Sequence, residues 1–238
     1  MTTATAPPTV RQRVEQLAGD RITALQRGYQ ADEAKAVAAL ARLRRGAGRE
    51  AGQLPDLWNL VDVTPLHEPH NGAQTLSERE LVCAEDALHV ALTLWALHQQ
   101  SRREAKMHQS GSRGKPRGVG AAVRRMMKPG EIDEPLRKRL VRAGTAPDLT
   151  ALAQRLRDIV LLLRRDQFPL DYALLAGQLY RWQQPGGPDD VRREWGRSFH
   201  AWHEEDQNAE GQTPADAPAT NTDTAVAPDT THTDKDAS

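Results

Sequence analysis

Cysteine is almost absent from this sequence: its 238 residues include only Cys83. A single cysteine excludes an internal disulfide framework and a metal site built on several thiolates. It also favours a reducing, intracellular environment, where disulfides are rare. The spacing of Cys83 to Val90 and Leu97 suits burial on a helix face, so we expect a core thiol rather than a nucleophile.

Long apolar runs and export signals are missing as well. No stretch approaches the roughly 18 consecutive apolar residues that a membrane span needs. The N-terminal sequence MTTATAPPTV has no basic segment followed by an apolar one, as a secretory signal would have. We therefore expect a cytoplasmic protein without membrane contact.

The sequence also lacks the short motifs of nucleotide-binding enzymes and zinc proteases. It contains neither a G-x-x-x-x-G-K-[ST] loop nor a G-x-G-x-x-G that follows a strand. The one local group of metal-ligand residue types, His67-Glu68-Pro69-His70, lies in a proline-bounded loop, whereas a zinc protease needs two histidines four apart on one helix. His89 and His98 are nine residues apart on one expected helix, so they face opposite sides. The sequence predicts no enzyme, no bound metal and no cofactor.

Tryptophan is the most frequent aromatic residue in a chain with three tyrosines and two phenylalanines. Aromatic rings can stack on single-stranded bases. Four of the five tryptophans, however, lie at helical spacing with apolar neighbours, which favours core packing: Trp58, Trp95, Trp182 and Trp195. Trp202 lies at the edge of the expected fold, and the pattern leaves its role open.

Acidic residues are nearly absent from residues 101–128, where Glu104 is the only one against nine lysines and arginines. These cations are Arg102, Arg103, Lys106, Arg113, Lys115, Arg117, Arg124, Arg125 and Lys128. Such a glycine-containing segment repels itself and suits a polyanion, most commonly a phosphate backbone. From charge alone, a solvated loop that binds nothing is an equal alternative.

The formal net charge of zero hides an asymmetry between the body of the chain and its end. Residues 203–238 carry nine acidic residues and only Lys235, whereas residues 1–202 carry 31 basic and 23 acidic residues. This tail consists of Ala, Thr, Pro and Asp with almost no large apolar residue, so we expect it to be disordered. Its sign suggests a weak electrostatic competitor for whatever the body binds, although solubility alone also explains it.

Helical periodicity dominates residues 10–202, which are rich in Ala, Leu, Arg, Glu and Gln. The pattern predicts helices at 10–27, 31–45, 78–100, 119–127, 133–142, 148–164, 170–183 and 189–202, with a helical turn near 57–61. Ser77 and Glu80 have the spacing of a capping box at the start of the longest helix. We expect an all-α, compact bundle of roughly eight or nine helices with a basic loop, between a disordered N-terminus (1–9) and the tail. The length fits one domain or two helical halves that meet near 101–118.

The order of several segments resembles a known family. LVRAGTAPDL (140–149), RLRDIVLLLR (155–164), FPLDYALLAGQLYRWQ (168–183) and VRREWGRSFHAW (191–202) follow one another as in the CasB family. LARLRRGAG (40–48), PDLWNLV (55–61) and the basic loop leading into GVGAAVRRM (118–126) are similar to the N-terminal part of that family. CasB proteins are the small subunit of the type I-E CRISPR surveillance complex, Cascade.

The resemblance implies a non-catalytic, all-helical subunit that is present in two copies per complex. Its expected partners are the large subunit, the backbone subunits, a second copy of itself, the guide RNA–target DNA hybrid and the displaced single DNA strand. A subunit that holds this strand must bind it regardless of sequence. Lysines and arginines that contact the phosphates bind in this way. Protein contacts to the strand can tip the nearly balanced exchange between duplex and hybrid.

Individual residues carry over from the family less completely than the fold. Arg44 and Arg45 match paired arginines of its N-terminal region, Arg142 matches the arginine of its L-I/V-R-A segment, and Arg124 follows its G-x-x-x-A-x motif. The loop cations at 102–117 align only loosely. Together with Arg42, Arg125 and Lys128, these residues form the predicted nucleic-acid interface.

Two other functions fit the same composition. A helix-turn-helix regulator using residues 133–165 would bind one duplex sequence tightly, whereas the resemblance implies weak, sequence-blind binding. A structural spacer within the complex would need no contact with the strand.

Overall fold

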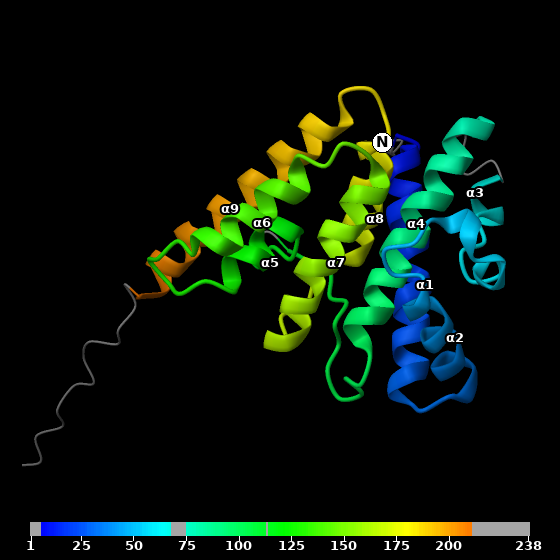
Figure 1. Cartoon of the computed structure of the whole chain (residues 1–238), viewed down its shortest axis with the longest axis horizontal. Helices are drawn as coiled ribbons and strands as arrows, with labels where there is room; N and C mark the ends of the chain where they lie inside the picture. The colour runs from blue at the N-terminus through cyan, green and yellow to red at the C-terminus, as the bar shows by residue number, and fades with distance from the viewer. Residues whose placement is uncertain (1–5, 68–74, 113, 211–238) are drawn as a thin grey trace, which may run out of the picture.

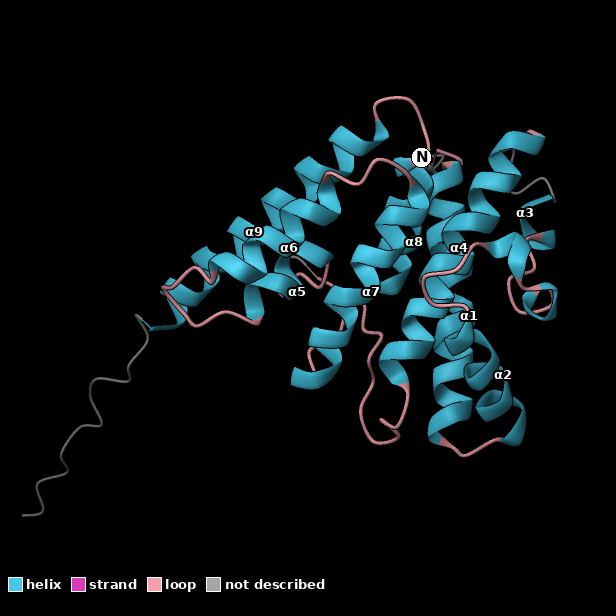
Figure 2. Cartoon of the chain, in the orientation of Figure 1, coloured by secondary structure: helices cyan, strands magenta, loops and turns pink. Residues whose placement is uncertain are grey.

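The computed structural model describes residues 6–67, 75–112 and 114–210, with side chains described through residue 201. Within these ranges the chain forms nine α-helices, two short 3-10 helices and no strand (Figures 1 and 2). The α-helices are α1 (Val10–Gln30), α2 (Ala34–Arg45), α3 (Thr64–His67), α4 (Glu78–Gln99), α5 (Val119–Arg125), α6 (Glu134–Gly144), α7 (Leu149–Asp166), α8 (Tyr172–Trp182) and α9 (Gly187–Glu210); the 3-10 helices are η1 (Ala51–Gln53) and η2 (Pro55–Leu57). The all-α prediction is confirmed.

Side-chain caps fix where several helices begin. The predicted capping box of α4 is present: the Glu80 backbone N–H donates to Ser77 Oγ at 3.4 Å, and the Ser77 N–H donates to Glu80 Oε2 at 2.8 Å. Thr9 and Gln12 form an equivalent box before α1. Asp133, Asp148 and Asp171 cap α6, α7 and α8 through one backbone N–H each. These caps satisfy donors that a helix start leaves free, so the sequence determines these boundaries locally.

Helix α4 forms the centre of the bundle, with α1, α2, α7 and α8 packed around it (Figure 1). Nearly all of its residues from Leu81 to Gln99 are buried, including Cys83 and Trp95. By length and mean hydropathy one 18-residue window of α4 meets the criteria for a membrane span, which corrects our expectation that no stretch approaches them. Because 83% of that window is buried inside the protein, α4 has the burial of a core helix.

Helices α5, α6 and α9 form a second group, in which α5 lies against α9 (Figure 1). The contact requires Gly120, because a Cβ there would lie 1.9 Å from the Trp195 carbonyl oxygen. Trp195 in turn stacks on Trp182 of α8, with ring centroids 6.2 Å apart. One hydrophobic core runs through both helix groups, from Val14 of α1 to Phe199 of α9.

Two sequence predictions need correction here. Trp58 is 60% exposed and therefore does not pack in the core, unlike Trp95, Trp182 and Trp195. Helix α9 continues to Glu210, past its predicted end at 202. The remainder of the predicted acidic tail, residues 211–238, lies outside the described residues, as do residues 1–5.

Candidate nucleic-acid interface

The end of α2 presents three of the predicted cations. Leu40 and Leu43 are buried on the inner face of this amphipathic helix, which leaves its last turn to place three exposed arginines outside: Arg42, Arg44 and Arg45. Cations suit this position because carbonyl groups are unpaired at a helix C-terminus. Arg45 forms an ion pair with Asp56, with Nη2 and Oδ2 3.0 Å apart. Among the described residues Arg42 and Arg44 form no ion pair, so they are available to a ligand.

Helix α7 lies against both the turn that follows α2 and the C-terminal end of α6. A Cβ on Gly48, just after α2, would lie 3.2 Å from Arg157 Cδ, so the exposed Arg157 of α7 lies against this turn. On α6, the predicted Arg142 is exposed, and its carbonyl oxygen accepts a hydrogen bond from Nη1 of Arg155. Arg155 therefore lies beside the end of α6, and Arg157 lies beside the turn that follows α2. Because they are two residues apart on a helix, their side chains leave α7 on opposite flanks.

The first cations of the 101–128 segment stabilise helix ends. Arg102 Nη2 donates to the Arg164 carbonyl near the end of α7, and Arg164 Nη2 donates to the Gln100 carbonyl at the end of α4, each at 3.2 Å. Arg103 pairs with Asp32 and lies over the Tyr29 ring, 5.4 Å from its centroid. Both residues, which the sequence predicted to bind phosphate, have intramolecular partners. The net charge of +8 over residues 101–128 therefore overstates the positive charge that is available to a ligand.

The next part of the segment forms an anchored turn. The backbone groups of Ser112 and Lys115 exchange hydrogen bonds of 3.1 and 3.2 Å. Asp171 holds both sides of the turn: its carboxylate accepts from the Gly111 N–H at 2.8 Å, and its own N–H donates to the Arg117 carbonyl at 2.8 Å. Lys115 is exposed and Arg117 half-buried on this turn. The predicted loop is therefore folded back onto the start of α8.

The remaining predicted residues have mixed surroundings. Lys106 and Lys128 are exposed, and Arg113 lies outside the described residues. Arg125 is half-buried, with its guanidinium 5.1 Å from the centroid of the Phe168 ring. Burial lowers the pKa of Arg125, and the nearby Arg117 lowers it further.

Arg124 corrects the predicted interface. Its side chain is 0% exposed, and its Nη1 donates to the Lys128 carbonyl oxygen at 3.2 Å. A fully buried guanidinium cannot reach the phosphate of a strand on the surface. The side chain belongs to the core between α5 and its neighbours, and we remove it from the interface.

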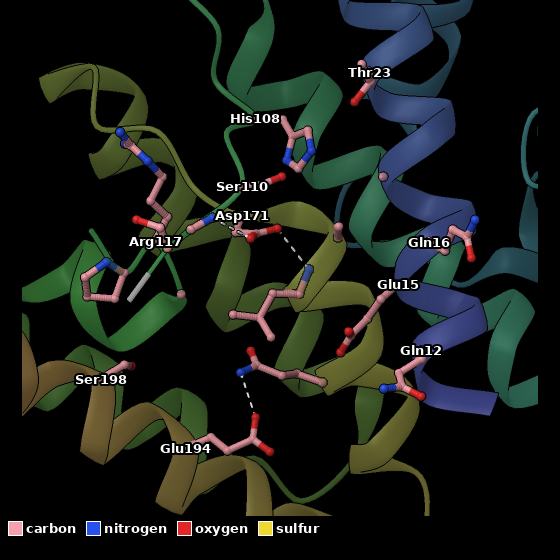
Figure 3. A pocket seen from close by; sticks show the side chains of 18 of the residues that line it. Gln12, Glu15, Gln16, Thr23, His108, Ser110, Arg117, Asp171, Glu194 and Ser198 are labelled. Atoms are coloured by element: carbon pink, nitrogen blue, oxygen red, sulfur yellow. Dashed lines mark hydrogen bonds between the residues drawn. The ribbon is translucent and has the colours of Figure 1, made fainter. Parts of the chain in front are cut away.

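A cleft of about 1000 Å³ lies between α1, the 108–118 segment, α8 and α9 (Figure 3). Two of its carboxylates pair with one arginine: Arg11 Nε lies 3.0 Å from Glu15, and its Nη1 lies 2.7 Å from Glu194. Burial raises the pKa of Glu15 despite the hydrogen bond from Arg11. Burial also acts to raise the pKa of Glu194, but hydrogen bonds from Arg11 and Gln178 outweigh it and lower the pKa. Because these groups hold α1, α8 and α9 together, we assign them a structural role rather than a catalytic one.

Other candidate reactive groups are also placed in structural roles. Cys83 is buried, and burial raises the pKa of its thiol, which disfavours a thiolate. His108 in the cleft wall is buried, and its Nδ1 accepts a hydrogen bond from the Tyr172 N–H at 3.2 Å. In the part of the chain that the structure describes, no three His, Cys, Asp or Glu residues gather as a metal site would require. Of the suggested ligands at 67–70, only His67 lies in that part.

The predicted interface does not include Arg155 and Arg157, which the structure places beside the end of α6 and the turn after α2. Both are visible as cations on an expected helix, but their spacing gives no indication of which helix lies opposite. The placement of Arg157 depends on its contact with Gly48, more than a hundred residues away in the chain, and that of Arg155 on its hydrogen bond to the Arg142 carbonyl oxygen.

Comparison with known proteins agrees with the CasB resemblance. The family model of CRISPR-associated protein Cse2 matches residues 39–200. Among solved structures, the chain is similar to CasB from Thermobifida fusca, with 50% sequence identity, a TM-score of 0.65, and coverage of 79% of this chain and 97% of that one. It is also similar to a chain of a CRISPR RNA-guided surveillance complex, at 20% identity and a TM-score of 0.57, covering 83% of this chain and 99% of that one; at this identity the likeness shows the fold alone. No curated protein sequence matches the chain.

Proposed function

The chain belongs to the CRISPR-associated Cse2/CasB family, and from this premise we propose that it is a non-catalytic subunit of a type I-E CRISPR Cascade complex. In this proposal two copies lie beside the guide RNA–target DNA hybrid in the cytoplasm and hold the displaced, non-target strand through its phosphates. The subunit contributes to antiviral defence by stabilising the R-loop. Forming the hybrid while opening the duplex is nearly balanced in free energy, so modest contacts with the released strand change the outcome.

One observation supports the strand-holding proposal: cations of α7 lie beside the end of α6, where Arg142 is exposed, and beside the turn that follows the exposed arginines of α2. Arg44, Arg142 and Arg157 each leave a guanidinium exposed to solvent. Phosphate contacts of this kind carry no sequence information, as a subunit that meets many different targets requires. The proposed interface comprises Arg42, Arg44, Arg45, Arg142, Arg155 and Arg157, with Lys106, Lys115, Arg117, Arg125 and Lys128 as further cations.

The helix-turn-helix alternative has less support. Helices α6 and α7 are adjacent and joined by a short turn. The start of α7, however, lies against the segment after α2, where Thr150 Oγ1 donates to Glu50 at 3.1 Å. A recognition helix must enter the major groove with its N-terminal residues free to contact bases.

Charge reversal tests the proposal. Substituting Arg44→Glu, Arg142→Glu and Arg157→Glu together should leave complex assembly intact and weaken R-loop formation to a similar degree on unrelated targets. The isolated variant should also bind a single-stranded oligonucleotide more weakly, with a salt slope shallower by about 0.7 per lost phosphate contact. R-loop stability measured by native gel electrophoresis and oligonucleotide binding measured by fluorescence anisotropy provide the two readouts.

The matched control reverses three exposed arginines elsewhere, Arg27→Glu on α1, Arg79→Glu on α4 and Arg193→Glu on α9. This control changes the net charge of the protein by the same amount as the test variant. It therefore distinguishes the loss of local phosphate contacts from the effect of a lower overall positive charge. Normal R-loops in the first variant would leave the structural-spacer function in place of strand holding. A defect on one target only would favour a sequence-specific regulator.

A further inference from the structure

Of the four tryptophans whose side chains the structure describes, Trp58 is the one that the fold leaves exposed. It is 60% exposed, whereas Trp95, Trp182 and Trp195 are each at most 5% exposed. An indole has a large apolar surface, and tryptophan is highly buried on average. The exposed indole ring of Trp58 is thus available to stack on a planar group of a ligand.

The backbone around Trp58 is well held. Its N–H donates to the Pro55 carbonyl at 3.3 Å, and its own carbonyl accepts from the Val61 N–H at 3.2 Å. Leu57 before it and Val61 after it are buried, at 1% and 4% exposure. These two anchors fix the turn, so the ring projects from an ordered segment that would lose little entropy when it binds.

The same turn places Trp58 beside the arginines of α2. Asp56, two residues before it, pairs with Arg45 at 3.0 Å. Leu57, directly before it, lies against Gly46, the C-cap of α2, because a Cβ on Gly46 would be 2.9 Å from Leu57 Cδ1. The two residues before Trp58 therefore contact the last residue of α2 and its C-cap. Trp58 therefore lies on a turn in contact with the end of α2, where the exposed Arg44 directly precedes Arg45.

We propose that Trp58 is a stacking residue for an unpaired base of the single strand whose phosphates contact the end of α2. The inference rests on the proposed function and extends it from the strand's phosphates to its bases. Stacking tolerates any sequence, because every base has a π-face, so it is compatible with a subunit that reads no sequence. Arginines beside the ring favour a nucleic-acid occupant, since they supply the charge that the adjoining phosphate needs.

The test uses the full-length protein, a fluorescently labelled thymidine oligonucleotide, and the same oligonucleotide with abasic positions. Trp58→Leu, which keeps apolar bulk without a ring, should weaken binding of the thymidine oligonucleotide by about 5- to 150-fold, the range for the loss of one stacked base. Trp58→Phe should retain most of the affinity. The salt slope should stay unchanged in both variants, because no phosphate contact is removed. The abasic oligonucleotide should not distinguish wild type from Trp58→Leu.

The outcomes separate this inference from the function on which it rests. If wild type binds the oligonucleotide and Arg44→Glu weakens binding while Trp58→Leu does not, the stacking role is wrong and the phosphate interface stands. If wild type does not bind at all, the strand-holding function itself fails. Should Trp58→Leu bind the oligonucleotide normally yet fail to join the complex, the ring would be a protein contact and the inference would be overturned.

Discussion

At the scale of single residues, two neighbouring arginines of α5 have different physical roles. Arg124 is completely buried and donates to the Lys128 carbonyl, whereas Arg125 is half-buried against Phe168. Removing a guanidinium from water is costly unless hydrogen bonds and charges compensate for it. Arg124 is therefore a structural cation, and reversing its charge would confound any test of nucleic-acid binding.

Arg124→Glu should lower the free energy of unfolding by about 3–5 kcal/mol, because it leaves an uncompensated buried charge next to a carbonyl oxygen. Lys128→Glu makes the same change of charge on an exposed side chain and should stay within about 0.5 kcal/mol of wild type. Chemical denaturation followed by circular dichroism measures both. Equal stabilities of the two variants would contradict the structural role of Arg124.

His98 should make the stability of the protein depend on pH. It is fully buried, with Nδ1 2.9 Å from Tyr172 Oη, and burial lowers its pKa to about 3. In the unfolded chain a histidine has a pKa of about 6.5. Because the folded pKa is the lower one, stability present above pH 6.5 is lost as the pH falls toward 3. The contribution is about 1.4 kcal/mol per pH unit in that window.

His98→Asn tests this directly, since asparagine can keep a hydrogen bond to Tyr172 without titrating. Between pH 7 and pH 5, wild type should lose about 2 kcal/mol more of its unfolding free energy than the variant. Buried His89 and His108, whose pKa values burial also lowers, remain in both proteins and cancel in the comparison. Parallel losses in the two proteins would show that His98 is not responsible.

At the scale of elements, the contact between α5 and α9 depends on a missing side chain. Gly120→Ala would place a Cβ 1.9 Å from the Trp195 carbonyl oxygen and 2.9 Å from the Phe199 nitrogen, both backbone atoms that cannot rotate away. We expect a loss of about 1–3 kcal/mol or more in unfolding free energy. Gly196→Ala on α9 meets nothing within 4 Å and should instead raise stability by about 0.5–1 kcal/mol. Thermal unfolding of both variants checks the opposite signs.

The elements were also the level at which the sequence was most informative. The Ser77–Glu80 box and the apolar periodicity are local signals, so they predicted the start and the burial of α4. In the short helix α5, by contrast, Val119, Ala122 and Val123 are all buried, and two adjacent arginines give no local sign of which one faces inward. The packing of α9 and its neighbours decides this. Trp58 was misplaced for a similar reason, because its apolar neighbours Leu57 and Val61 supply the buried face of the turn.

At the scale of the whole molecule, a net charge of zero combines a basic body with an acidic end. The sequence showed this division, and the family resemblance indicated the fold and several of the cations. It could not show that α7 lies against Gly48, because contacts between distant segments follow from packing rather than from local pattern. It also overstated the basic segment, in which Arg102 and Arg103 are engaged by carbonyl groups and by Asp32.

The charge division predicts an effect of the acidic end on nucleic-acid binding. Residues 211–238 contain five aspartates and one lysine, tethered to a body with eight more basic than acidic residues up to residue 202. A tethered anionic segment competes with a free strand for the same cations at a high effective concentration. Replacing Asp216, Asp223, Asp229, Asp234 and Asp236 with asparagine should therefore raise the affinity for a single-stranded oligonucleotide severalfold at low salt. The advantage should shrink as salt rises, since the Debye length falls to about 10 Å at 0.1 M.

A control that replaces five threonines of the same segment with serine keeps every charge and should bind like wild type. Fluorescence anisotropy across a salt series measures all three proteins, and equal affinity of the asparagine variant and wild type at low salt would leave solubility as the role of the acidic residues.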